Sequence, residues 1–163
     1  GDLDLGTYMR SSPTGSTLIG GTEPECDRLD WLVDVDAVNL NRTKELFEAQ
    51  VTRAARRFPA LQIPNSPSGI AGIYDVAADW TPIYDRTELD GFFVAIGTSG
   101  NQFKNAPMVG KLITALIDEV RAGRDHDLDP VKVRAERTGN EINLGAFSRK
   151  RLFNADNTGT VMG

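Results

Sequence analysis

The chain opens with short β-prone runs separated by turn residues. Residues 3–10 carry β-branched and aromatic side chains, residues 11–16 contain a proline and a glycine, and residues 17–20 are again apolar or β-branched. Proline and glycine in such positions are typical of the connection between two strands. The pattern therefore predicts an antiparallel hairpin over residues 3–21, with a long connection.

A helical pattern follows between residues 41 and 58. Apolar side chains recur there at helical spacing, at Phe47, Val51, Ala54, Ala55 and Phe58. Asn41 is expected to be the N-cap, and Pro59 is expected to end the helix. Residues 64–69 contain two prolines, an asparagine and a glycine, which indicates a loop.

Three short apolar runs come next, at residues 70–76, 82–84 and 92–96, and each is predicted to be a strand. The last is continuous enough to be a strand buried on both faces. A second helix is indicated by a regular apolar stripe that ends before Gly123. The stripe consists of Val109, Leu112, Ile113, Leu116, Ile117 and Val120. After an acidic loop at 125–129, the remaining residues carry only scattered apolar anchors.

Several single residues receive structural interpretations. Asp79 and Asp85 flank a Trp-Thr-Pro turn and are expected to serve as turn or capping groups. Structural roles are also expected for four further side chains, with the two aromatic ones in the core: Tyr74, Trp80, Cys26 and His126.

Composition excludes several classes of function. The net charge is −5 over 163 residues, which argues against a general nucleic-acid binder. We therefore expect the arginines at 53, 56 and 57 and the basic run 149–151 to form solvated or packing faces. One cysteine and one histidine allow neither an internal disulfide nor a His/Cys metal cluster. No apolar run reaches the roughly 20 residues of a membrane span, and no signal peptide opens the sequence, so a cytoplasmic location is expected.

The segment with the clearest chemistry is residues 92–107, which reads as a strand, a loop of small residues and then a helix. Free backbone N–H groups at a helix start bind negative charge, and Gly97 and Gly100 allow a ligand to approach closely. Many strand–glycine–helix junctions are simply tight connections. The segment lacks the Walker pattern, which argues against a nucleoside triphosphate.

The loop nevertheless resembles the C-terminal flavin motif of the D-amino-acid oxidase-like superfamily, which includes sarcosine oxidases, glycine oxidases and D-amino-acid dehydrogenases. The resemblance is carried by an eight-residue run, then by Ala106-Pro107 and Gly110. That run is Gly97, Thr98, Ser99, Gly100, Asn101, Gln102, Phe103 and Lys104. Upstream, Gly72-Ile73-Tyr74 and residues 79–83 are similar to the segment with which that family re-enters its FAD domain.

The resemblance implies an α+β fold in three parts. Residues 1–80 correspond to the later half of a mixed-sheet substrate domain. Residues 81–123 correspond to the C-terminal strand–loop–helix of an FAD-binding domain, and residues 124–163 form a tail.

The resemblance also implies site residues. Residues 97–104 would lie against the pyrimidine edge of the isoalloxazine ring, with Lys104 near both the ring and a substrate carboxylate as the catalytic residue. Tyr8 and Arg10 lie two apart on a strand and would face the substrate, although packing is an equal alternative for them. The family often has His at the position of Asn101, and some members attach flavin through Cys at the position of Gly72. Non-covalent FAD is therefore implied.

The implied activity is oxidation of an amino acid or a secondary amine by hydride transfer to flavin. The GxGxxG unit that binds the ADP half of FAD is absent from these residues, so we expect a fragment, or a subunit that needs a separate ADP-binding partner, inactive as isolated. Alternatives are a non-catalytic folding or oligomerisation domain, with a homo-oligomer left open, and a small binding module for an anionic metabolite.

Overall fold

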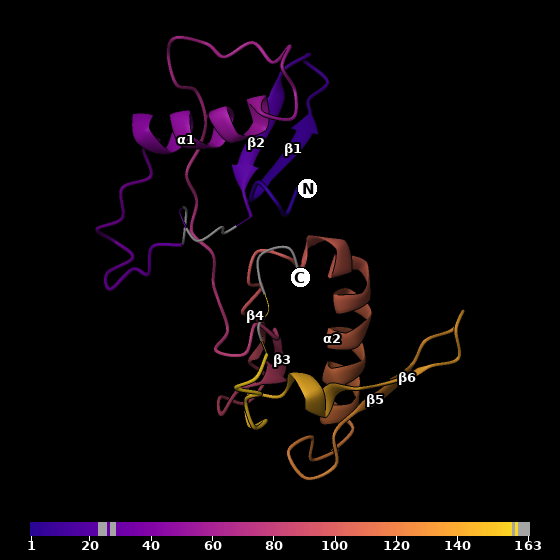
Figure 1. Cartoon of the computed structure of the whole chain (residues 1–163). Coiled ribbons are helices and arrows are strands. Elements are labelled where there is room, and N and C mark those ends of the chain that lie inside the picture. Colours follow the sequence, from indigo (N-terminus) through magenta and orange to yellow (C-terminus); the bar gives the residue numbers. More distant parts are fainter. Residues whose placement is uncertain (23–25, 27–28, 158, 160–163) are drawn as a thin grey trace. The chain divides into compact units, whose positions relative to one another are not determined.

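The computed structural model describes residues 1–22, 26, 29–157 and 159. The chain forms two compact units, Gly1–Ile73 and Tyr74–Gly163, each with its own helix and antiparallel strands (Figure 1). Residues 158 and 160–163 of the expected tail lie outside the described residues.

The predicted N-terminal hairpin is confirmed. Strand β1, Thr7–Ser11, pairs antiparallel with β2, Thr17–Gly21, so that Thr7 lies opposite Gly21 and Ser11 opposite Thr17. The buried Thr7 hydroxyl donates to the Gly20 carbonyl oxygen at 3.1 Å. This bond ties the two strands together at the end of the hairpin away from its turn.

The first helix, α1 (Lys44–Ala55), packs against both strands of the hairpin (Figure 1). Its N-cap is Thr43, whose hydroxyl accepts from the Leu46 N–H at 3.4 Å, so the expected cap at Asn41 is wrong. A Thr immediately before the first helical turn satisfies the free N–H groups directly, whereas position 41 lies too far from them. Within this helix, the side chains of Val51 and Ala54 are buried.

A strand at residues 70–76 is not formed. These residues have no regular structure, and Ile70 is 91% exposed. The backbone carbonyl and the carboxylate of Asp75 bind a later loop instead of a neighbouring strand. Tyr74 was expected in the core and is 45% exposed, because no sheet covers it in the described part of the chain.

The second unit is built on a second hairpin and a long helix. Strand β3 (Ile83–Arg86) pairs antiparallel with β4 (Phe93–Ile96), and helix α2 (Ala106–Arg121) packs against both. The predicted helix is confirmed, and Gly123, at φ +98°, follows its end. The core of this unit consists of Tyr84, Leu112, Leu116, Val131 and Leu144.

Strand β4 is not buried on both faces. Ala95 and Ile96 are exposed, because the sheet has only two strands and α2 covers one face of it. A continuous apolar run cannot by itself distinguish a strand inside a layered sheet from one at an open edge.

Three small elements follow α2 and were missed by the sequence pattern. They are β5 (Lys132–Arg134), β6 (Glu141–Asn143) and the short 3-10 helix η2 (Leu144–Phe147). Strands β5 and β6 form an antiparallel hairpin that extends away from α2 in Figure 1. Within the described residues, no helix is long and apolar enough to cross a membrane.

Asp85 is a buried centre of polar contacts, so its interpretation as a turn or capping group is wrong. Its side chain is fully buried and accepts hydrogen bonds from the Ser148 hydroxyl at 2.9 Å and from Arg149. Arg149 donates through its backbone N–H at 2.8 Å and its guanidinium at 3.0 Å. A carboxylate on a strand therefore holds a segment more than sixty residues away in sequence.

A second ion-pair centre lies beside it. Asp127 accepts from the guanidinium groups of Arg86 and Arg149 and from the Lys150 ammonium. Burial alone would raise the pKa of Asp127, but these cationic donors outweigh it and hold that pKa well below its usual range. The basic run 149–151 is thus a packing face, as one of its two interpretations proposed.

His126 has the structural role expected of it. It is 1% exposed, and its Nδ1 accepts from the Val131 N–H at 3.1 Å, which leaves the hydrogen of the neutral ring on Nε2. Nε2 lies 3.6 Å from a carboxylate oxygen of Asp85. Burial lowers the pKa of His126, and the nearby charges of Asp85 and Asp127 offset this only in part.

This environment predicts a loss of stability as the pH falls through the ordinary histidine pKa of about 6.5, because the unfolded chain takes up a proton that the folded ring resists. The contribution is fully present above that pH. Urea unfolding at pH 8 and pH 5.5 measures it. The variant His126→Asn keeps an acceptor for Val131 but cannot be protonated, so its stability should depend less on pH in this window. An equal pH dependence in both proteins would contradict the assignment.

Candidate functional site

The loop singled out by the sequence joins β4 to α2. It runs from Gly97 through a short 3-10 helix, η1 (Phe103–Asn105), directly into α2. Gly97 and Gly100 have φ values of +69° and +77°, and Ser99 has φ +50°. Glycine adopts such values without steric cost, whereas Ser99 adopts one against its preference. The loop is therefore held in a specific conformation by its surroundings.

Asp75 is the main support of this loop. Its carboxylate accepts from the Gly97 N–H at 2.8 Å and from the Thr98 hydroxyl, and its carbonyl accepts from the Ser99 N–H at 3.1 Å. Burial would raise the pKa of Asp75, but the bonds from Thr98 and Gly97 lower it below the usual value. An ionised Asp75 thus holds the first three residues of the loop.

Ser99 fixes the loop from inside. It is fully buried, and its hydroxyl accepts from the Ala77 N–H and donates to the Gly97 carbonyl, both at 3.3 Å. A side chain on Gly97 would bring its Cβ within 3.1 Å of the Ala77 Cβ. Glycine at 97 is therefore required by both backbone geometry and close approach.

The Gln102 side chain is engaged within the protein. Its oxygen accepts from the Tyr84 hydroxyl at 3.0 Å and from the Asn105 amide at 2.8 Å, while its NH₂ group donates to Asn101. Tyr84 belongs to the core, so Gln102 links the loop to the packed sheet and helix. Its side chain supports the loop, and only its backbone is left for a ligand.

The outer surface of the loop carries groups without protein partners. In the described part of the chain, the backbone N–H groups of Gly100, Gln102 and Phe103 donate to no protein atom, and the Lys104 ammonium forms no ion pair. These groups lie immediately before α2, where the helix dipole adds partial positive charge. Phe103 is 96% exposed beside them. This arrangement suits a flat ligand with a negatively charged edge.

The residues proposed for substrate lie in the first unit, and their settings differ. Arg10 lines a cavity of about 400 Å³, whose other lining residues are Met9, Ser11, Thr17, Phe58, Ala60 and Leu61. The ring of Tyr8 lies against Gly20, where an added Cβ would come within 2.5 Å of it. Arg10 therefore has free space beside it, whereas Tyr8 is used largely for packing within the hairpin.

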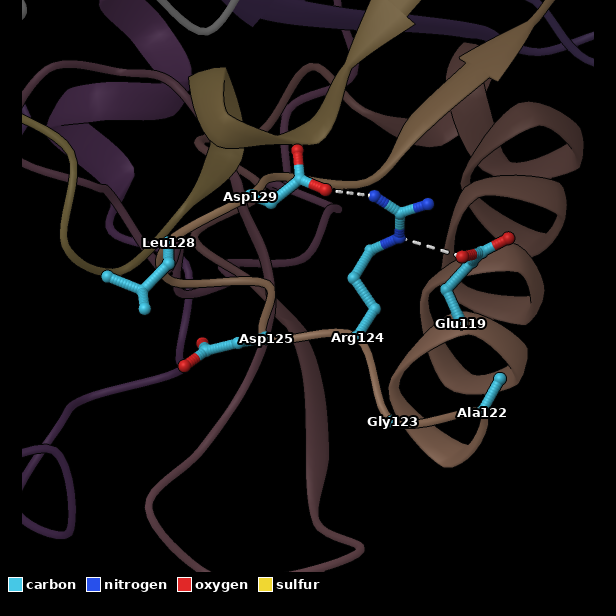
Figure 2. A pocket seen from close by; sticks show the side chains of 7 residues that line it. All are labelled: Glu119, Ala122, Gly123, Arg124, Asp125, Leu128 and Asp129. Atoms are coloured by element: carbon cyan, nitrogen blue, oxygen red, sulfur yellow. Dashed lines mark hydrogen bonds and ion pairs between the residues drawn. The ribbon is translucent and has the colours of Figure 1, made fainter.

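A second cavity, of about 460 Å³, lies at the C-terminal end of α2 (Figure 2). Arg124 crosses it and pairs with Glu119 at 2.7 Å and with Asp129 (Figure 2). These three charged side chains of the cavity therefore pair with one another. None of the residues predicted for a site lines this cavity. In the described chain, no group of three or more His, Cys, Asp or Glu side chains is arranged to hold a metal ion.

Comparison with known families decides the general class. The family model for FAD dependent oxidoreductases, DAO, matches residues 1–116, which is well over half of the chain. The chain belongs to the FAD-dependent oxidoreductase family. No curated protein and no solved structure matches it. The match includes the N-terminal hairpin and the whole loop from Gly97 to Lys104, and it ends within α2.

Membership of this FAD-dependent family gives the outer surface of the loop a chemical context, since FAD carries a ring whose pyrimidine edge accepts hydrogen bonds. Sequence reasoning had missed the loop's supports, Asp75 and Ala77. Asp75 stood in a run taken for a strand, and its contact with residues 97–99 gives no local pattern. An acidic residue beside a glycine-rich segment was the only available signal.

Proposed function

We propose that this chain supplies the part of an FAD-dependent oxidoreductase that faces the isoalloxazine ring. In this proposal, the enzyme oxidises an amino acid or a secondary amine by hydride transfer, as sarcosine and glycine oxidases and D-amino-acid dehydrogenases do. The observation that carries it is a set of backbone N–H groups with no protein partner in the described chain, together with Lys104, on a loop before α2 in a chain of this family.

The residues present fit a flavin ring. The N–H groups of Gly100, Gln102 and Phe103 would donate to the acceptor edge of the ring, and glycine at 97 and 100 keeps the surface open. When bound, FAD supplies the redox chemistry by accepting a hydride from the substrate. Lys104 and the positive end of α2 would stabilise negative charge at that edge.

Substrate-binding roles are proposed for residues of each unit, taken separately. Arg10, beside its cavity, would hold a carboxylate through a charge-assisted hydrogen bond, as would Lys104. Tyr8 would border the substrate with the exposed part of its ring. We assign no general base to these residues, since hydride removal from an amine needs none from this chain.

The attachment of FAD is proposed to be non-covalent. Gly72, at the position where some sarcosine oxidases have the attaching cysteine, has no side chain to form a bond. The sequence contains no two glycines spaced as in G-x-G, so the ADP half of FAD would be bound by residues other than these 163.

The purified chain is therefore expected to lack stoichiometric FAD and to bind added FAD weakly. With contacts to the ring edge alone, we expect a dissociation constant of about 1 mM or weaker, which corresponds to a binding free energy of roughly −4 kcal/mol. Flavin absorbance after gel filtration, followed by an FAD titration, tests this. A yellow, stoichiometric preparation would contradict the proposed division of the FAD site. A titration with no saturable binding would contradict the role of the loop and would favour a non-catalytic folding or oligomerisation domain.

A further inference from the structure

The C-terminal segment Ser148–Asn157 is attached to the turn that precedes β3. Arg151 forms a two-pronged ion pair with Asp79, with Nη2–Oδ1 at 2.6 Å and Nε–Oδ2 at 3.0 Å. The two side chains are only 7% and 3% exposed. Nη2 also donates to the Thr81 carbonyl at 2.7 Å, and the Asn157 amide donates to the Asp79 carbonyl.

The residues just before Asp79 support the candidate flavin loop. Asp75 and Ala77, four and two residues before Asp79, make the contacts to Gly97, Thr98 and Ser99 described above. Asp79 caps the turn between these supports and β3 by accepting from the Thr81 N–H at 3.1 Å. Residues 75–81 are thus held by Arg151 and Asn157, and they in turn hold the loop at residues 97–99.

The strained backbone of Trp80 shows that surrounding contacts must fix the conformation of this stretch. Trp80 has φ +57°, which is unfavourable for a residue with a bulky side chain. A conformation of this kind persists only when its surroundings determine it. Arg151 and Asn157 bind the carboxylate and carbonyl of Asp79, directly before Trp80. Together with the bond from the Trp80 N–H to the Ala77 carbonyl at 2.9 Å, these contacts hold the turn in place.

We infer that Arg151 and Asn157 are positioning residues for the flavin loop, acting through the Asp79 turn and its neighbours Asp75 and Ala77. The inference rests on the proposed function for its relevance to flavin, but the coupling itself involves only this chain. The family match ends at residue 116, so these two residues lie outside the matched region.

The experiment is amide hydrogen exchange on the full 163-residue chain, comparing wild type with Arg151→Met. The reporters are the N–H groups of Gly97, Ser99 and Ala77, all bonded within the loop or to its support. Relative to core amides of α2, their exchange should accelerate at least about tenfold, because a local opening is made easier without global unfolding. Arg151→Lys, which keeps the charge but loses the planar fork, should restore only part of the protection.

The matched control is Arg124→Met, which also removes an ion-paired arginine, in this case one with two carboxylate partners, but lies beyond the other end of α2. It should leave the loop amides unchanged. Should Arg151→Met fail to fold, Asn157→Ala removes a single hydrogen bond and should give a smaller selective effect. Unchanged loop exchange, or equal acceleration in loop and α2, would overturn the inference.

An FAD titration of the same proteins separates this inference from the proposed function. Weaker FAD binding in Arg151→Met than in Arg124→Met is expected if both hold. Selective loosening of the loop in a chain that binds no FAD would uphold the coupling and refute the flavin role. FAD binding that is equal in both variants, despite a loosened loop, would overturn the positioning role.

Discussion

Replacing Asp79 with alanine is expected to lower the free energy of unfolding of the second unit by about 3–5 kcal/mol, as is usual when one partner of a buried ion pair is removed. Arg151, which is 7% exposed in the intact pair, would lose the carboxylate that neutralises it, since Asp79 is its ion-pair partner in the described chain. The Thr81 N–H would also lose its acceptor. Urea unfolding followed by the amide signals of α2 gives the measurement.

The matched control is Asp129→Ala, because Asp129 also pairs with an arginine, Arg124, but has a side chain that is 69% exposed. An exposed pair contributes little, so its removal should change stability only slightly. The double variant Asp79→Leu with Arg151→Met should recover much of the loss, because apolar replacement of both partners removes the uncompensated charge. Equal effects of Asp79→Ala and Asp129→Ala would show that the buried pair is not a holding contact.

Replacing Lys104 with methionine in the complete FAD-binding enzyme proposed above is expected to weaken binding of a carboxylate substrate analogue by roughly one to two orders of magnitude. This corresponds to about 1.5–3 kcal/mol for a charge-assisted hydrogen bond to a desolvated carboxylate. The reduction potential of the flavin should fall, because one cation beside the anionic reduced ring is lost. Both are measured against wild type, by analogue titration and by spectroelectrochemistry.

Folding should be almost unaffected by that change, since lysine and methionine have close helix propensities and Lys104 forms no ion pair in the described chain. Lys111→Met is the matched control, because Lys111 also lies near the start of α2 but pairs with Glu136 on the surface. If analogue affinity and potential move in neither variant, Lys104 is a solvated helix residue. A large loss of thermal stability in Lys104→Met would give it a structural role.

The elements that could be predicted from the sequence are those encoded by local pattern. The hairpin at residues 7–21 has turn residues between two β-prone runs, and α2 has a regular apolar stripe ended by a glycine. The glycine-rich loop between β4 and α2 was likewise visible, because its residues are contiguous. In each case the information lies within about twenty residues of chain, the span over which turn chemistry and helical periodicity act.

The predictions that were wrong concern residues whose structure is determined by contacts between distant parts of the sequence. Residues 70–76 are apolar enough for a strand, but Asp75 bonds to residues 97–99 instead of a neighbouring strand. Asp85 looks like a turn residue, yet it is buried by Ser148 and Arg149, more than sixty positions later. The tail contributes Leu144 to the core although its apolar residues show no period. Burial of charge through distant partners leaves no local pattern to read.

In the proposed function, the loop from Gly97 to Lys104 binds the isoalloxazine ring of FAD. Amide chemical shifts of the isotope-labelled chain, titrated separately with FAD and with ADP-ribose, test it most directly because ADP-ribose lacks the ring. We expect saturable shifts with FAD at Gly100, Gln102, Phe103 and the first turn of α2, and none there with ADP-ribose. Shifts at those amides with both ligands, or with neither, would contradict it.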